Sequence, residues 1–328
     1  MQSLRGTGDG TGKRGRALPA WARAVAAFVS IALAPLPVAA GLSDIPSGFV
    51  DTGVGATPMG MAGAVVAGVG GADAVFWNPA ALGLGDASHG FAASYCDQMG
   101  LVPYSALSAA FPVGERYAAG AGVLYSGDDA LVEATAIAAL ARAVSPPPWC
   151  QSRPAYLGLA VRGRWASFGD SGDDEQQVSG TALGGGLDVG AVVPLTRVLT
   201  FGVTGRDVVS ALTWDSSVRG SYGEAVPAAV VAGLAAEPRE GILVEVDLDK
   251  ALHGDGHDVL SVGASLEVLG AAVVRGGYRK AFQPDEFEEF AVGAGASARA
   301  GAGRIVVDAA YLFGRLDDTL RLSVGYRF

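Results

Sequence analysis

Two histidines and two aspartates lie together in the stretch His253-Gly-Asp-Gly-His-Asp258. Imidazole and carboxylate groups at this spacing could bind a divalent metal such as zinc. The two glycines leave the loop flexible, however, so that ordering it around an ion would cost entropy. We therefore interpret the stretch as a polar surface loop and expect no metal, with His253 and His257 as the candidate ligands that a metal would need.

Two further motifs imitate active sites. The run Gly169-Asp-Ser-Gly-Asp173 resembles the nucleophile motif of serine proteases, but it lies in an acidic stretch and no histidine has a triad context. The run Gly68–Ala74 is glycine-rich but lacks the preceding strand and the Lys-Ser/Thr pair of a phosphate-binding loop. The sequence therefore predicts neither an enzyme nor a protein with a cofactor.

The remaining charged residues occupy alternate positions of apolar segments. Acidic residues mark segments 240–251 and 257–270, and basic residues mark segment 271–282. Because charges on neighbouring strands can pair across a sheet, we expect an internal ladder of ion pairs, in which Asp308 faces Arg321 and Arg327. A polar conduction path is the alternative interpretation. The residues expected to line such an interior are Arg162, Arg164, Glu245, Asp247, Glu267, Arg275, Arg279, Asp308, Arg321 and Arg327.

These charges are positioned by segments that alternate with a period of two. In the last segment Leu320, Leu322, Val324, Tyr326 and Phe328 share one face, opposite two arginines. About 14 such segments follow one another, an even number as in single-chain bacterial barrels, although 12 or 16 stay open. We expect strands at 88–97, 102–113, 115–127, 130–144, 154–169, 178–195, 197–212, 224–237, 240–251, 257–270, 271–282, 287–299, 303–314 and 319–328.

The pattern therefore predicts an all-β fold, a transmembrane antiparallel β-barrel over residues 88–328. A soluble β-sandwich also alternates, but the charged inner faces and the aromatic last residue favour a barrel. Mean hydropathy is +0.34, yet no apolar run of helical membrane-span length follows residue 40. Both termini are expected in the periplasm, so the connections after odd-numbered strands should be the longer ones. Most of them are, and the Ser145–Arg153 segment is the exception.

Residues 1–40 form the pattern of a secretory signal peptide. Basic residues from Lys13 to Arg23 precede an apolar run that ends in Val38-Ala-Ala40, so we expect cleavage before Gly41. The leader carries five of the 23 basic and one of the 33 acidic residues, which leaves 18 − 32 = −14 for the mature chain. Such a charge excludes nucleic acid as a partner, because neutralising phosphates needs lysine and arginine.

Residues 41–87 do not alternate and are rich in glycine and alanine. Asn78 is a good helix N-cap and Pro79 fits the first helical position. The segment is long enough to fold into the mouth of a barrel, so we expect a hatch, or plug.

Several short motifs resemble the PorV/PorQ family, which is related to the FadL-type long-chain fatty-acid channels. They are Gly60, Ala62–Ala64, Ala67, Asp73-Ala74 and Trp77-Asn78-Pro79-Ala80, then Arg275–Tyr278, Phe290–Gly293, Val307–Tyr311 and the last strand. The resemblance implies a 14-strand outer-membrane barrel with an N-terminal hatch, in contact with lipid and lipopolysaccharide.

The resemblance also implies two alternative functions. FadL-type members pass hydrophobic compounds through the barrel and sideways into the membrane, whereas PorV-type members assist type IX protein secretion. This chain departs from the FadL pattern in its short outer loops. In barrels with a similar last strand, the assembly machinery reads the ending, which corresponds here to Tyr326 and Phe328.

The two cysteines, Cys96 and Cys150, could form a disulfide in an exported chain. The predicted strand order puts them at opposite ends of the barrel, much farther apart than the roughly 7 Å between Cα atoms that a disulfide tolerates. We therefore expect no bond between them.

Overall fold

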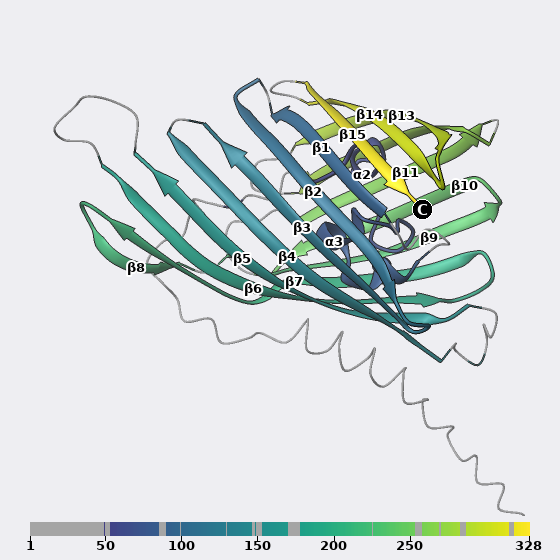
Figure 1. The fold of residues 1–328 in the computed structure, drawn as a ribbon, viewed down its shortest axis with the longest axis horizontal. Coiled ribbons are helices and arrows are strands. Elements are labelled where there is room, and N and C mark those ends of the chain that lie inside the picture. Colours follow the sequence, from purple (N-terminus) through teal and green to yellow (C-terminus); the bar gives the residue numbers. More distant parts are fainter. Residues whose placement is uncertain are drawn as a thin grey trace, which may run out of the picture. The chain divides into compact units, whose positions relative to one another are not determined.

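A computed structural model describes residue 49 and residues 53–84, 90–98, 100–128, 130–145, 148, 153–169, 178–224, 226–252, 258–268, 270–282, 287–314 and 318–328. Its strands form one antiparallel sheet (Figure 1). They are β1 (Gly90–Gln98), β2 (Val102–Val113), β3 (Tyr117–Gly127), β4 (Leu131–Val144), β5 (Ala155–Phe168), β6 (Gly180–Pro194), β7 (Leu199–Ser216), β8 (Gly220–Glu224), β9 (Ala229–Arg239), β10 (Ile242–Ala251), β11 (Asp258–Val268), β12 (Ala272–Phe282), β13 (Glu288–Ala300), β14 (Gly303–Phe313) and β15 (Thr319–Arg327).

The sheet closes into a barrel of 14 strands, as predicted. Each of these strands pairs with its neighbours in the chain, and β1 closes the ring by pairing with β15 from Gly90↔Arg327 to Cys96↔Arg321. One further strand, β8, lies outside the ring. Among the described residues it pairs only with β7, with which it forms a hairpin.

The hairpin β7–β8 corrects one prediction, because the stretch from Thr213 to Gly223 was expected to be a loop. Strand β7 continues to Ser216, and its buried Leu212 and Trp214 keep the alternation of the strand. The turn residues after Trp214 gave the stretch a loop-like composition, although they only form the tip of a hairpin.

The outer face of the barrel is apolar. In β15, Leu320, Leu322 and Val324 are about half exposed, while Arg321 and Ser323 between them are buried. The same alternation recurs on β10, where Val244, Val246 and Leu248 are exposed. A belt of exposed aliphatic side chains around a closed barrel is the surface that lipid covers. No helix among the described residues is long and apolar enough to cross a membrane.

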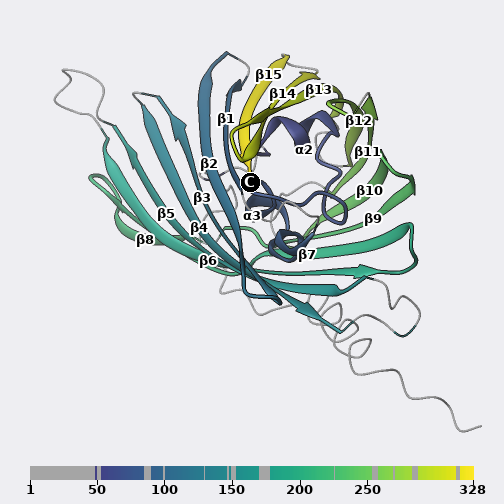
Figure 2. The same ribbon diagram turned by 45° about the vertical axis from the view of Figure 1, so that its right-hand side comes forward.

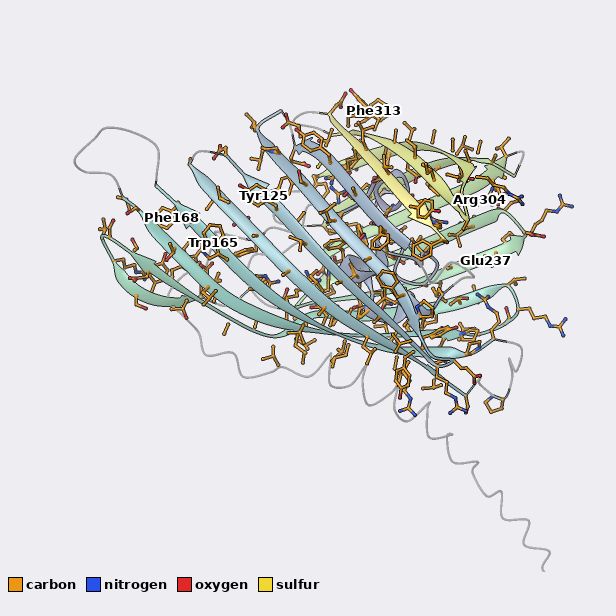
Figure 3. The ribbon with its side chains drawn as sticks, viewed as in Figure 1. Tyr125, Trp165, Phe168, Glu237, Arg304 and Phe313 are labelled. Atoms are coloured by element: carbon orange, nitrogen blue, oxygen red, sulfur yellow. The ribbon has the colours of Figure 1, made fainter. Side chains whose placement is uncertain are left out.

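Aromatic side chains lie toward both ends of this belt. On β3, Tyr117 and Tyr125 are 40% and 48% exposed. They are about 26 Å apart along the strand, or roughly 20 Å along the barrel axis at the usual tilt. Figure 3 shows Tyr125, Trp165 and Phe313 toward one end of the barrel strands, and Glu237 and Arg304 toward the other end. Two aromatic girdles of this kind mark the borders of a membrane-spanning barrel.

The described residues from Gly53 to Leu84, called the interior segment below, lie inside the barrel (Figure 2). The interior segment contains α2 (Ala56–Gly60), α3 (Ala74–Trp77) and the 3₁₀ helix η1 (Pro79–Gly83). Its Phe76 and Leu82 pack against alanines that point inward from the wall. Whether the full stretch 41–87 forms a hatch after cleavage at residue 40 stays a prediction.

Glycines of the wall let the interior segment approach the sheet. A Cβ atom on Gly158 would lie 2.1 Å from the backbone nitrogen of Ala80, and one on Gly277 would lie 2.4 Å from the carbonyl carbon of Met61. Larger residues at these positions would push the interior segment away. The strands rich in alanine and glycine, in which the alternation of apolar and polar residues is weak, therefore form the surface against which the interior segment packs.

Candidate functional site

A cavity of about 300 Å³, called the lumen cavity below, lies between the interior segment and the wall. Its lining combines apolar and charged side chains. The apolar residues include Phe49, Val54, Phe76, Leu124 and Ile137, and the polar residues include Glu133, Thr135, Arg162, Arg164, Arg206, Asp207 and Asp249.

Ion pairs join the charged residues of this lining. Arg164 donates two parallel hydrogen bonds of 2.7 Å to the carboxylate of Asp207, and both side chains are less than a tenth exposed. Arg162 pairs with Asp188 at 2.6 Å. Arg206 pairs with Asp249. A second cavity of about 300 Å³ shares this last pair and continues toward Trp77. The Arg206–Asp249 pair therefore lines both open volumes.

Glycines lie beneath the ion pairs. Arg164 of β5 and Asp207 of β7 reach each other across β6, where a Cβ atom on Gly186 would lie 2.1 Å from Asp207 Oδ1. Arg275 of β12 and Asp308 of β14 pair at 2.7 Å across β13 in the same way. The intervening residue there is Gly295, whose Cβ atom would lie 2.1 Å from Asp308 Oδ1. These two pairs thus link next-nearest strands, an arrangement that was not predicted, whereas the Arg162–Asp188 pair joins the neighbouring strands β5 and β6.

An irregularity in β7 supplies two of these charges. Arg206, Asp207 and Val208 together face the single residue Asp188 of β6, because the register shifts there. Asp207 has φ = +50°, a conformation that aspartate tolerates better than most residues, and its N–H donates to Asp188 Oδ1 at 2.8 Å. This bulge turns consecutive side chains inward.

The bulge explains why two charged residues of the cavity lining were missed. Strict alternation assigns only every second residue of β7 to the interior, so it cannot place both Arg206 and Asp207 there. Asp188 of β6, which pairs with Arg162, was also left out. The sequence signal that could have found them is the charged pair Arg206-Asp207 within an otherwise apolar strand, since bulges often redirect side chains in this way.

Two carboxylates of β10 hold the interior segment. Asp247 Oδ2 accepts hydrogen bonds from the N–H groups of Val65 and Val66, at 2.7 and 2.9 Å. Glu245 Oε1 accepts one from Ala67 N–H at 2.5 Å. Both carboxylates are almost fully buried. These predicted lumen charges therefore bind backbone N–H groups and are not partners of arginine in the ion-pair ladder.

Strand β15 holds the N-terminal end of the interior segment. Arg321 is 3% exposed and donates from Nη1 to the Gly53 carbonyl oxygen at 2.7 Å. The hydroxyl of Ser323 accepts from Ala56 N–H at 2.8 Å. The expected contact between Arg321 and Asp308 is thus wrong, because Asp308 is taken by Arg275 and Arg321 by the interior segment.

The predicted motif Trp77-Asn78-Pro79-Ala80 forms the junction between α3 and η1 in the interior segment. Asn78 is fully buried, caps η1 by accepting from Ala80 N–H at 3.0 Å, and donates to the Val66 carbonyl oxygen at 2.7 Å. Trp77 Nε1 donates to the Val54 carbonyl oxygen at 2.9 Å. The motif ties three parts of the interior segment together.

The other predicted residues lie away from the lumen cavity. Arg279 pairs with Glu289 at 2.9 Å beside the second cavity. Glu267 and Arg327 are exposed near strand ends, so the expectation that Arg327 faces Asp308 is also wrong. Cys96 is buried with a free thiol. His253, His257 and Cys150 lie outside the described residues, and the described part of the chain holds no cluster suited to a metal.

Comparisons with known proteins identify the fold. No family model matches the chain. No curated protein matches it. Solved structures do match: the CymD monoaromatic hydrocarbon channel is 18% identical with a TM-score of 0.59, over 85% of this chain and 98% of that one. The toluene transporter TodX of P. putida is 14% identical with a TM-score of 0.59, over 84% and 98%.

A third solved structure that matches is that of a FadL homologue. A FadL homologue of Pseudomonas aeruginosa is 13% identical with a TM-score of 0.57, over 83% of this chain and 97% of that one. At these identities the likeness shows the fold alone, which is the antiparallel 14-strand barrel. It does not extend to the PorV/PorQ family, and that part of the resemblance stays a prediction.

Proposed function

We propose that this chain is a passive channel of the bacterial outer membrane that lets small hydrophobic solutes cross. The observation that carries the proposal is the lumen cavity, which lies between a wall-anchored interior segment and an apolar-coated barrel. The solved channels with the same fold, which include a toluene transporter and a monoaromatic hydrocarbon channel, support it.

The interior segment is the plug of this channel in our proposal. Hydrogen bonds between its backbone and the side chains of Asp247 and Arg321 hold it at two separate strands, β10 and β15. Polar bonds of this kind can break and reform without loss of the apolar core that the segment makes with the wall. A solute would then pass beside the segment, and the barrel itself need not open.

The proposal includes a position in the membrane. Both termini lie in the periplasm, the outer surface contacts lipid and lipopolysaccharide, and the last strand with Tyr326 and Phe328 is read by the barrel-assembly machinery. Protease accessibility of tags inserted at the chain end and in the 170–177 connection tests this orientation. A tag at Phe328 that is cleaved in intact cells would contradict it.

Uptake in whole cells tests the transport function, because lipopolysaccharide slows hydrophobic molecules that a plain lipid bilayer would admit. The chain is expressed in a Gram-negative host that lacks FadL-type channels, and the initial rate of radiolabelled toluene uptake is compared with that of empty-vector cells. We expect a several-fold higher rate. Equal rates at verified outer-membrane levels would reject the proposal.

The alternative taken from the resemblance, an accessory of type IX-like secretion or outer-membrane assembly, makes a different prediction. It expects unchanged toluene uptake and secretion components among the proteins that co-purify with a tagged chain from its native host. The two experiments together separate the two functions.

A further inference from the structure

The arginines of the lumen cavity are electrically compensated. Among the described residues that line it, the arginines are Arg162, Arg164 and Arg206. Each holds a carboxylate, from Asp188, Asp207 and Asp249 respectively. The cavity therefore offers hydrogen-bond donors without offering a net positive charge.

The lining includes one carboxylate beyond those that pair with the three arginines. Glu133 lines the lumen cavity, and its Oε1 accepts a hydrogen bond from Phe49 N–H at 2.8 Å. Including Asp188, the buried partner of Arg162, three guanidinium groups then face four carboxylates. An anionic head would enter a site whose formal charge is already negative, and a charge that leaves water without a partner is costly.

Apolar residues of the same lining suit an apolar body. Phe49, Phe76 and Ile137 come from three separate parts of the chain and all line the cavity. The guanidinium of Arg164 lies 5.7 Å from the centre of the Phe49 ring, so an aromatic group is already accommodated against a charged residue of the lining. A volume of about 300 Å³ is at the lower end of ligand sites.

We propose that the lumen cavity binds a neutral amphiphile, which is a small apolar chain or ring with an uncharged hydroxyl or amide head. The head can accept from a paired guanidinium and donate to a paired carboxylate, while the body contacts the apolar residues of the lining. This inference rests on the proposed function and narrows its solute class, since it excludes ionised fatty acids.

A matched series of probes tests the head group. Decanol, decanoate, decylammonium and decane share a chain length, and their binding to the protein in lipid nanodiscs is measured by calorimetry against protein-free nanodiscs at neutral pH. We expect decanol to bind at least about tenfold more tightly than decanoate, a difference of roughly 1.4 kcal/mol. Tighter binding of decanoate or of decylammonium than of decanol would overturn the proposal, as would equal binding of decane.

Charge variants test the cause. Asp249→Asn removes the carboxylate that pairs with Arg206 and is expected to raise decanoate affinity about tenfold, with little effect on decanol. Asp207→Asn should act the same way through Arg164, and asparagine tolerates the positive φ at this position. The pair Arg206–Asp249 is the more exposed of the two, with side chains 14% and 28% exposed, so that its variant is the safer one to fold.

Asp308→Asn is the matched control. It breaks the Arg275–Asp308 pair, which is outside the lining of the lumen cavity, and should leave the order of probe affinities unchanged. An unchanged preference in both cavity variants would overturn the proposal. Absence of toluene uptake in cells would instead reject the proposed function, so the two failures are distinguishable.

Discussion

Single glycines decide where charges can pair inside this barrel. Gly186 and Gly295 lie under the Arg164–Asp207 and Arg275–Asp308 pairs, and each would place a Cβ atom 2.1 Å from a carboxylate oxygen. Without a side chain on the middle strand, two long side chains from flanking strands meet above it. Such buried pairs are sensitive to the loss of one partner, because the remaining charge is then uncompensated.

Gly295→Ala should therefore destabilise the protein by about 1–3 kcal/mol, because the new methyl group displaces Asp308 from Arg275. The measurement is the midpoint of urea unfolding in lipid vesicles. Gly163→Ala is the control, since a Cβ atom at Gly163 meets no atom within 4 Å. Equal destabilisation by the two substitutions would show that the ion pair does not depend on the glycine.

A pH-dependent contribution comes from Asp73 in the interior segment. Burial raises its pKa to about 6, although the Ser108 hydroxyl that donates to it at 3.3 Å acts in the opposite direction. Because the folded state holds this proton more tightly than the unfolded state, the contribution of Asp73 to stability rises as pH falls from about 7 toward about 4.

Asp73→Asn should remove this slope, worth roughly 2 kcal/mol between the two pH limits. Unfolding midpoints at several pH values give the measurement. Asp128→Asn is the control with the opposite sign: N–H groups of Ala130 and Leu131 lower the pKa of that exposed turn carboxylate, so its stabilisation is lost as pH falls. A wild-type slope in Asp73→Asn would contradict the assignment.

At the scale of elements, the interior segment is held by polar bonds to β10 and β15. Asp247 satisfies two N–H groups that would otherwise be buried without a partner. Asp247→Ala should reduce the hydrogen-exchange protection of Val65 and Val66 about 10- to 100-fold while the strand amides stay protected.

Asp258→Ala is suited as its control, because Asp258 pairs with Lys250 at 2.9 Å on the exposed surface. Mass spectrometry resolves the exchange of peptides from the interior segment and from the strands. Unchanged protection of Val65 and Val66 in Asp247→Ala would mean that the segment is held by its apolar packing alone.

The elements themselves could be predicted from the sequence, but the way they bring charges together could not. Alternation gave all 14 barrel strands, and even the Ala-rich β4 (Leu131–Val144) agrees with its predicted range. The alternation is interrupted at the bulge in β7, so it could not identify both Arg206 and Asp207 as residues of the interior. It also says nothing of pairs that skip a strand, as Arg275 and Asp308 do.

At the scale of the whole molecule, the barrel combines an apolar coat, two aromatic girdles and a filled interior. The coat and girdles account for a place in a membrane, and the interior segment accounts for the absence of a wide water-filled pore in our proposal. The lumen cavity is the part of the interior that stays open to a solute. Filling it should therefore block uptake without changing the fold.

Toluene uptake by a cavity-filling variant tests this central claim most directly. Ala229 lines the lumen cavity, whereas Ala136 is exposed on β4, so Ala229→Trp and Ala136→Trp form a matched pair. We predict that cells with Ala136→Trp take up toluene like wild type, and that Ala229→Trp lowers the rate to that of empty-vector cells at equal outer-membrane levels. Uptake by Ala229→Trp at the wild-type rate would contradict a solute path through the lumen cavity.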